Sequence, residues 1–413
     1  MVFALFKRIL TAIVTLILVI FSVSQIYIDI KSIHNPTDQI RDVVQDFLAS
    51  KALNLGANPY QRLDLLHSRY TAEDQTPMFS HPTPHTPYSI FLFSLFEFDK
   101  LNEAIFFWYI LQILTFVSFF WFLSSEIKPI QSSNFYRAIC VLVLLGADPV
   151  RMELILGQWN FILLLFVLLH VYACEKNVLL KILSVAAAVL TKSVGLGHIL
   201  NDIILLRIKA ILIYLSTFIV SSLCIIYFKF DAIWVLNYFT NIGPRLSKIY
   251  LQEPANGSLL SSIAGLLAFV TKKDLAFDSS IPFLILLFIG IILVFQSKKI
   301  IDSDLRSFYL WATSLLLLPV AWVHCLVLLL PSISKIIPRI KYNNLTDFDK
   351  LYGGFLIFSW YFVRQPGLVF MEYLENNKHL ISSALNISGV WFSIYVVLVM
   401  IYIIRLDKLF VLR

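Results

Sequence analysis

The chain has 413 residues, of which 59% are hydrophobic and only 14% are charged. Ordinary soluble domains are roughly 45–50% apolar and about 25% charged, and a water-soluble fold cannot bury an apolar excess of this size. The composition therefore excludes a water-soluble globular enzyme, a disordered chain and a nucleic-acid-binding domain, although the net charge is +7. We expect an all-α, polytopic integral membrane protein.

The first apolar run follows Lys7 and Arg8 and extends to about residue 28. It has no clear small-x-small cleavage site, so we expect an uncleaved first span rather than a signal peptide. Several later runs are shorter than the ~20 residues of a full crossing and are expected to be tilted, broken or re-entrant. About twelve candidate spans result, at 9–28, 101–123, 135–148, 154–173, 178–195, 196–206, 210–228, 281–297, 305–319, 321–337, 350–364 and 389–405.

Basic residues cluster in short segments between these runs, and the positive-inside rule assigns such segments to the cytoplasm. Both termini are then cytoplasmic, and the whole chain (1–413) is one transmembrane domain. The segments 29–87 and 229–280 become outward loops, as does roughly 365–388. The apolar run within 259–270 is expected to be interfacial or re-entrant.

The first outward loop, 29–87, carries seven acidic and five basic residues. Asp42 and Asp46 are four residues apart, so on a helix they share one face. A carboxylate beside the membrane can take a proton from an attacking hydroxyl. The alternative is a solvated helix start. A turn, Gly56-Ala57-Asn58-Pro59-Tyr60, follows.

A second polar group lies between two apolar runs. The segment 146–153 includes Arg151, and Gly157-Gln158-Trp159-Asn160 opens the next run. Polar residues are costly inside a membrane and are usually paired or functional. Two interpretations stay open: a polar site at the outer end of the span, or helix capping and hydrogen bonds between helices.

Two further residues interrupt apolar runs. Lys192 either extends its amine to the interface or faces an anionic ligand. His324 ends the segment Pro319-Val320-Ala321-Trp322-Val323-His324, in which proline breaks the span and Trp322 fits an interfacial belt. His324 either pairs with a phosphate or carboxylate or makes a structural hydrogen bond. The four cysteines have no CxxC spacing, so neither a disulfide framework nor a zinc site is indicated.

Taken in order, these motifs resemble glycosyltransferase family 87, polytopic enzymes of the GT-C fold that use polyprenyl-phosphate sugars. The resemblance covers about residues 40 to 335. Asp42 and the turn at 56–60 match the family's aspartate and Gly-x-x-Pro-Tyr turn, and later segments match at 81–87, 157–160, Lys192, 256–259 and 319–324. The chain departs from the family pattern at Asp46, Gly257 and Cys325.

The resemblance implies an inverting sugar transfer at the outer face of the cell (plasma or inner) membrane. The donor would be a polyprenyl-phosphate hexose, commonly mannose, and the acceptor an extracytoplasmic glycan or glycolipid. Its phosphate leaving group needs cationic or hydrogen-bonding partners rather than a strong acid.

Asp42 is the expected general base, with Asp46 as the alternative. Neither a cofactor nor nucleic acid is expected as a partner, and a divalent metal between the carboxylates stays open. The expected donor-phosphate residues are His324, Lys192 and Arg151, and the expected pocket residues are Gln158, Asn160, Asn256, Trp322 and Tyr60.

Two other function classes fit the same spans. A transporter or flippase of a lipid-linked sugar would explain Lys192, but it would not need an acidic outward loop, and transporters usually place their polar site near the bilayer midplane. The second alternative function class is a non-catalytic membrane assembly subunit. Transfer of sugar to an acceptor without ATP or a gradient distinguishes an enzyme from the transporter, and activity of the purified single chain distinguishes it from the subunit.

Overall fold

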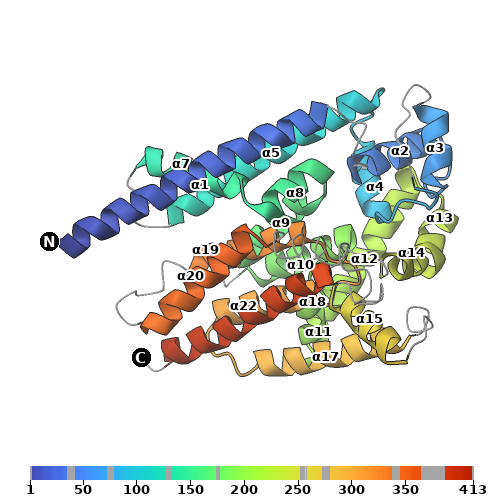
Figure 1. Cartoon of the computed structure of the whole chain (residues 1–413). Helices are drawn as coiled ribbons and strands as arrows, with labels where there is room; N and C mark the ends of the chain where they lie inside the picture. Colours follow the sequence, from blue (N-terminus) through green and yellow to red (C-terminus); the bar gives the residue numbers. More distant parts are fainter. Residues whose placement is uncertain are drawn as a thin grey trace.

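The computed structural model of the chain describes residues 2–34, 42–71, 79–126, 133–173, 177–251, 256, 258–271, 280–336, 345–363 and 387–411. Within these ranges the chain is helical and forms no strand, which confirms the all-α prediction. Both termini lie at one end of the elongated molecule, and short helices gather at the other end (Figure 1).

The first half of the chain forms α1 (Val2–His34), α2 (Asp42–Asn54), α3 (Leu63–Tyr70), α4 (Pro87–Ser94), α5 (Leu101–Glu126), α7 (Asn134–Leu145), α8 (Asp148–Leu156), α9 (Asn160–Tyr172) and α10 (Val178–Lys192). The second half forms α11 (Leu196–Ile204), α12 (Ile208–Phe228), α13 (Ala232–Asn237), η2 (Tyr238–Ile242), α14 (Gly243–Tyr250), α15 (Leu259–Thr271), α17 (Ile281–Ser297), α18 (Ser303–Leu316), η3 (Val323–Leu329), α19 (Leu330–Ile336), α20 (Asp347–Tyr361) and α22 (Ile387–Val411).

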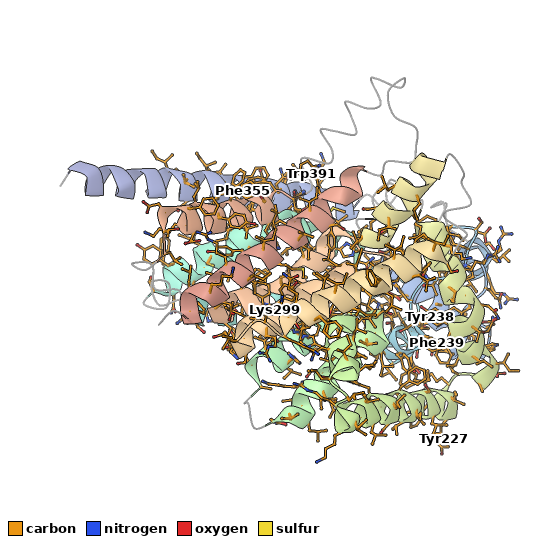
Figure 2. All side chains as sticks on the ribbon, turned by 90° about the horizontal axis from the view of Figure 1, so that it is seen from below. Tyr227, Tyr238, Phe239, Lys299, Phe355 and Trp391 are labelled. Atoms are coloured by element: carbon orange, nitrogen blue, oxygen red, sulfur yellow. The ribbon has the colours of Figure 1, made fainter. Side chains whose placement is uncertain are left out.

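Three of the described helices are long and apolar enough to cross a membrane, with windows at Ala12–Asp29, Leu101–Ser125 and Ile208–Phe228. Their outer surfaces carry large apolar side chains. Tyr227 is 84% exposed and projects from the edge of the molecule, as Figure 2 shows. Such surfaces need lipid as their solvent, which supports the membrane character. The predicted count of about twelve spans is not established by these helix lengths and stays a prediction.

Some predicted span boundaries differ from the structure. The run predicted at 154–173 is divided by a turn, because Gly157 adopts a left-handed conformation (φ +70°) that ends α8. The run predicted at 321–337 begins as the 3₁₀ helix η3 after Pro319 rather than as an α-helix. The first helix, predicted to end near residue 28, continues to His34.

The two segments predicted as outward loops meet at one end of the bundle. The ring of Tyr238 of η2 packs against Tyr60 with centroids 5.0 Å apart and the planes tilted by 32°, and its hydroxyl donates to the Pro84 carbonyl at 2.7 Å. In Figure 1 α2, α3, α13 and α14 occupy the end opposite to the termini. The side of the membrane that this end faces stays a prediction.

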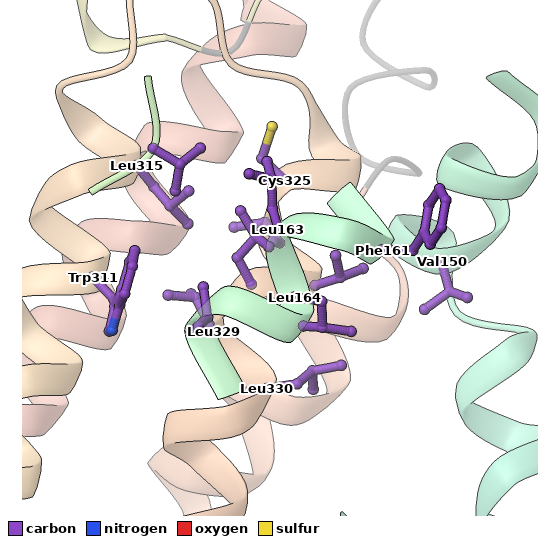
Figure 3. Close-up of a cluster of buried hydrophobic side chains, with 14 of the residues drawn as sticks. Val150, Phe161, Leu163, Leu164, Trp311, Leu315, Cys325, Leu329 and Leu330 are labelled. Carbon is purple, nitrogen blue, oxygen red and sulfur yellow. The ribbon is translucent and has the colours of Figure 1, made fainter. Parts of the chain in front are cut away.

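The central core lies where α8, α9, α18, η3 and α19 pack together. Val150, Phe161, Trp311 and Cys325 are among its buried members (Figure 3). Leucines fill the space between these helices. The core holds η3, and therefore His324, in a fixed position against α8 and α9.

Arg151 of α8 joins that core to the first helix. Its Nε and Nη2 donate to the two carboxylate oxygens of Asp29 at 2.7 and 2.8 Å, and its Nη1 lies 3.7 Å from Asp148. The Arg151 and Asp29 side chains are only 10% and 8% exposed. A bidentate pair with little water competition fixes both distance and angle between α1 and α8.

Replacing Arg151 by methionine should lower the free energy of unfolding by about 3–5 kcal/mol, because Asp29 would remain buried without its counter-charge. Thermal unfolding of the full chain in neutral detergent measures the change. The double variant Asp29→Asn/Arg151→Met is the control and should regain much of the loss. If Arg151→Met unfolds at the temperature of the unchanged chain, the pair does not stabilise this contact.

Candidate active site

Two aspartates on one face of α2 begin the candidate site, as their spacing predicts. Asp46 is fully buried, whereas Asp42 is partly exposed at the first turn of the helix. Nearly every other residue of α2 is buried, so the helix cannot rotate to present another face. The two carboxylates therefore have fixed and different surroundings.

Both oxygens of Asp46 are occupied. Oδ1 lies 2.5 Å from Nδ1 of His85, and Oδ2 accepts from Trp159 Nε1 at 2.8 Å. Because a carboxylate only accepts, the proton of the His85 contact belongs to Nδ1. Asp46 thus orients a histidine and is not free to take a proton from a substrate.

Asp42 has a freer carboxylate in a charged setting. Gln45 Nε2 donates to its Oδ1 at 2.8 Å. Burial raises the pKa of Asp42 to about 6, against the lowering effect of the positive charges on His85 and Lys192, while Asp46 adds a smaller upward shift. A carboxylate with a pKa close to neutrality is suited to accept a proton during catalysis.

His85 is a functional candidate that the sequence-based prediction of site residues missed. Burial lowers its pKa, but the charge and hydrogen bond of Asp46, followed by the charge of Asp42, raise it by more, so the net shift is upward. Tyr60 donates to the His85 carbonyl at 3.2 Å. In the sequence, His85 is marked by its position between Pro84 and Pro87, two residues that restrict the backbone around it.

The start of α4 attaches this histidine to the end of α10. The Thr86 side chain caps α4 by accepting from the Ser89 amide, and it donates to the Leu190 carbonyl at 2.8 Å. Ser89 Oγ donates to the Thr191 carbonyl at 2.9 Å. These bonds place Lys192, the last residue of α10, beside the aspartates.

Lys192 is held rather than extended into solvent. Its Nζ donates to Gln158 Oε1 at 2.7 Å. Its positive charge acts on Asp42, His85, Glu153 and His324, and also on Cys325. Lys192 therefore lies within the site, and its binding of an anionic ligand stays a prediction.

The turn between α8 and α9 brings Gln158 and Trp159 to the aspartates. Trp108 Nε1 donates to the Gly157 carbonyl at 2.9 Å, and Gln112 Nε2 donates to the Gln158 carbonyl at 2.9 Å. A Cβ on Gly157 would lie 2.8 Å from Val43 Cβ. The absence of a side chain at Gly157 therefore lets α2 approach this turn.

Asn160 and Glu153 form a buried pair behind Lys192. The Asn160 backbone amide and Nδ2 donate to the two Glu153 oxygens at 2.7 and 2.8 Å. Glu153 also escaped the sequence-based prediction, although it belongs to the polar segment before the turn. Asn160 is therefore placed next to the site through Glu153, with its amide nitrogen already engaged.

Asn256 fixes the segment that carries Trp322 and His324. Its Oδ1 accepts from the Ala321 amide at 3.0 Å, and its Nδ2 donates to the Tyr250 carbonyl at 2.9 Å. Trp322 is partly exposed. His324 is 1% exposed, and its Nε2 has no hydrogen-bond partner within the described residues. A buried imidazole nitrogen of this kind is available for a ligand.

Not all predicted site residues come together. The residues that gather at one place with His85 are Asp42, Asp46, Lys192, Gln158 and His324. They are supported through the bonds described above by Tyr60, Asn160 and Asn256. Arg151 is engaged by Asp29 and Asp148, so its charge is already balanced. Within the described ranges no group of three or more His, Cys, Asp or Glu side chains is arranged to hold a metal ion.

Comparison with known proteins gives one match. The family model described as glycosyltransferase family 87 matches residues 84–331. Neither the curated proteins nor the solved structures include a match. The matched region contains His85, Gln158, Lys192 and His324, whereas Asp42 and Asp46 precede it.

Replacing Gly157 by alanine should reduce activity about 10²-fold, because a displacement near 1 Å of the α2 carboxylates is enough for such a loss. The positive φ adds strain of about 1–3 kcal/mol, which thermal unfolding measures alongside the transfer rate.

Gly354 of α20 is the matched control, because a Cβ there meets nothing within 4 Å. Gly354→Ala should keep full activity and raise stability by about 0.5–1 kcal/mol. Equal activity of Gly157→Ala and the unchanged chain would contradict the proposed contact between the turn and α2.

Proposed function

The chain belongs to glycosyltransferase family 87, and from that premise we propose that it transfers a hexose from a polyprenyl-phosphate sugar to an extracytoplasmic glycan or glycolipid. As a glycosyltransferase with apolar helices, it works with a sugar donor, an acceptor and a lipid bilayer. The proposed sugar is mannose, transferred with inversion. The proposed location is the cell membrane, with the site on the outward face and both termini cytoplasmic.

One observation carries the proposal: Asp42 is a partly exposed carboxylate beside His85 and Lys192, and its pKa is about 6. At neutral pH most of it is ionised and can accept a proton. The neighbouring cations suit the anion that a lipid-phosphate donor releases. Base and phosphate partners therefore occur together where a membrane-bound donor and a water-accessible acceptor can meet.

The proposed reaction is a single displacement. The acceptor hydroxyl oxygen attacks the anomeric carbon and gives its proton to Asp42, so a carbon–oxygen bond forms. The bond between the anomeric carbon and the donor phosphate oxygen breaks, and the phosphate leaves with the electron pair. Attack opposite to the leaving phosphate inverts the anomeric configuration. No strong acid is required, since a phosphate is already anionic near neutral pH.

The remaining residues have separate proposed roles. Lys192 and His324 bind the donor phosphate, and Gln158 holds the Lys192 amine in place. Trp322, partly exposed next to His324, contacts the sugar or the lipid. Asn160, Asn256 and Tyr60 position these groups through the contacts described above.

Two of the expected residue roles differ in this proposal. Asp46 is proposed as a positioning residue for His85 rather than as the base, because both of its oxygens are already bonded. Arg151 is not proposed to bind the donor, because its guanidinium already pairs with Asp29. His85 is added, as a group that sets the charge next to Asp42.

Asp42→Asn should lower the transfer rate about 10²–10⁴-fold, because the amide cannot accept a proton. Transfer of radiolabelled mannose from a polyprenyl-phosphate donor to acceptor in membranes containing the full chain measures this rate. Asp64→Asn is the control, since Asp64 lies in the same loop, pairs with Arg62 at 2.5 Å and otherwise accepts from the Leu65 amide within the described residues.

Each alternative has its own outcome in that assay. An unchanged rate in Asp42→Asn would remove Asp42 as the base, and loss in Asp46→Asn alone would move the role to Asp46. Glucose in place of mannose on the same lipid tests the sugar, and a sugar nucleotide tests the need for a lipid-linked donor.

Activity should rise with pH through about 6 and level off above it, because only ionised Asp42 accepts a proton. His85→Gln removes a positive charge that lowers the pKa of Asp42, so the rise should move to higher pH. His81→Gln, in the same segment, should leave the midpoint unchanged. A midpoint that His85→Gln does not move would show that His85 does not act on the base.

A further inference from the structure

A second polar pocket lies at the other end of α10 from the candidate active site. Lys181 lies near the start of α10, and Lys192 is its last residue. At 1.5 Å per residue the two are separated by roughly 16 Å along the helix. The helices α9, α10, α18 and α19 supply most of the pocket's lining, which includes His170, Lys181, Asp304, Ser307, Ser332 and Lys335.

The pocket has a cavity volume of about 50 Å³ and is partly open to its surroundings. A single water molecule needs about 10–15 Å³ of such volume, so this space suits a small group of a few atoms rather than a large substrate. Its wall is polar where neighbouring helices are apolar. Within a membrane protein such polar clusters are costly unless a partner satisfies them.

Two serine hydroxyls in the wall lack that partner. The Oγ atoms of Ser307 and Ser332 are buried and make no hydrogen bond within the described residues. Ser332 is only 2% exposed and lines the pocket. An unsatisfied buried hydroxyl costs about 1–3 kcal/mol. These hydroxyls therefore indicate a partner that is not part of the described chain.

The charge of the lining favours an anion over water alone. Lys335 Nζ pairs with Asp304 at 2.8 Å and donates to the Val171 carbonyl at 2.7 Å. Lys181 adds a second positive charge, which acts on His170 and His198. Water could satisfy the serines, but it would not balance the described lining, which holds two lysines and one aspartate.

Donors of this kind match a phosphate group. Serine hydroxyls and lysine amines both donate to phosphate oxygens, and the hydrogen bonds from ammonium groups are charge-assisted. At the N-terminus of α18 the Asp304 and Leu305 amides already donate to Asp302. The side chains themselves supply the donors.

We propose that this pocket binds a phosphate-bearing anion at the end of the bundle opposite to the candidate active site. The phosphate belongs either to the headgroup of an anionic phospholipid or to a soluble phosphate compound. The binding is independent of the sugar-transfer reaction, and a bound phosphate would join α10 to α18 and α19. The pocket thereby becomes a stabilising site for the bundle.

The full chain, purified in neutral detergent, is the material for the test. Its unfolding temperature is measured with phosphatidylglycerol, with phosphatidylcholine, with inorganic phosphate and with chloride at equal ionic strength. We expect phosphatidylglycerol or inorganic phosphate to raise the temperature where phosphatidylcholine and chloride do not. Stabilisation by phosphatidylglycerol alone identifies a lipid headgroup, and stabilisation by inorganic phosphate as well identifies a soluble phosphate.

Variants assign the effect to the pocket. Lys181→Gln and Ser332→Ala should weaken binding at least 10-fold, while Lys181→Arg should retain it because the charge is kept. Lys298→Gln, at an exposed lysine outside the pocket, is the control and should match the unchanged chain. Unaltered transfer activity in each variant shows that the fold and the candidate active site are intact.

Three outcomes would overturn the proposal. Equal stabilisation by phosphatidylcholine or chloride would show a general effect of lipid or salt rather than binding of a phosphate-bearing anion. Equal stabilisation of Lys181→Gln and the unchanged chain would place the anion elsewhere. Loss of stabilisation in Lys298→Gln would show a diffuse surface-charge effect rather than a bound phosphate.

Discussion

The candidate active site depends on the buried carboxylate of Asp46. One oxygen holds His85 Nδ1 at 2.5 Å and the other accepts from Trp159 Nε1 at 2.8 Å. These two bonds join α2, the segment before α4 and the turn between α8 and α9, which are far apart in the sequence. An uncompensated carboxylate at that depth would be strongly destabilising, so its two partners must hold their positions. Asp42, Lys192 and Gln158 take their places on the frame that results.

The two aspartates thus have different roles because their surroundings differ. Asp46 is enclosed and bonded at both oxygens, whereas Asp42, one helical turn earlier, is partly exposed and, within the described part of the chain, accepts one side-chain hydrogen bond, from Gln45. Burial raises the pKa of Asp42, and the cations of His85 and Lys192 limit the rise to about 6. Two carboxyl groups with separated environments are a common basis for assigning one to proton transfer and the other to support.

The sequence predicts the local features of this site and not its long-range contacts. The four-residue spacing of Asp42 and Asp46 predicts a shared helix face, because it is a property of neighbouring residues, whereas the predicted run 154–173 missed the break at Gly157. His85 could not be assigned from spacing, since its partner Asp46 lies 39 residues earlier. The pairing of Arg151, expected to bind the donor phosphate, was equally out of reach, because its partner Asp29 is 122 residues away. Span number is equally hard to predict, because helices such as α9 and η3 with α19 are shorter than a full crossing.

The position of Lys192 shows how an apolar bundle can place a charge. On α10 the side chains of Val185, Ala186 and Ala188 are buried, and the small alanines allow neighbouring helices to approach closely. This packing leaves the helix little freedom to slide, and Ser89 and Thr86 hold its last turn through the Leu190 and Thr191 carbonyls. A lysine at the end of a helix fixed in this way cannot extend freely to the interface. The apolar middle of α10 thereby separates two polar ends, one beside the aspartates and one in the lysine- and serine-lined pocket.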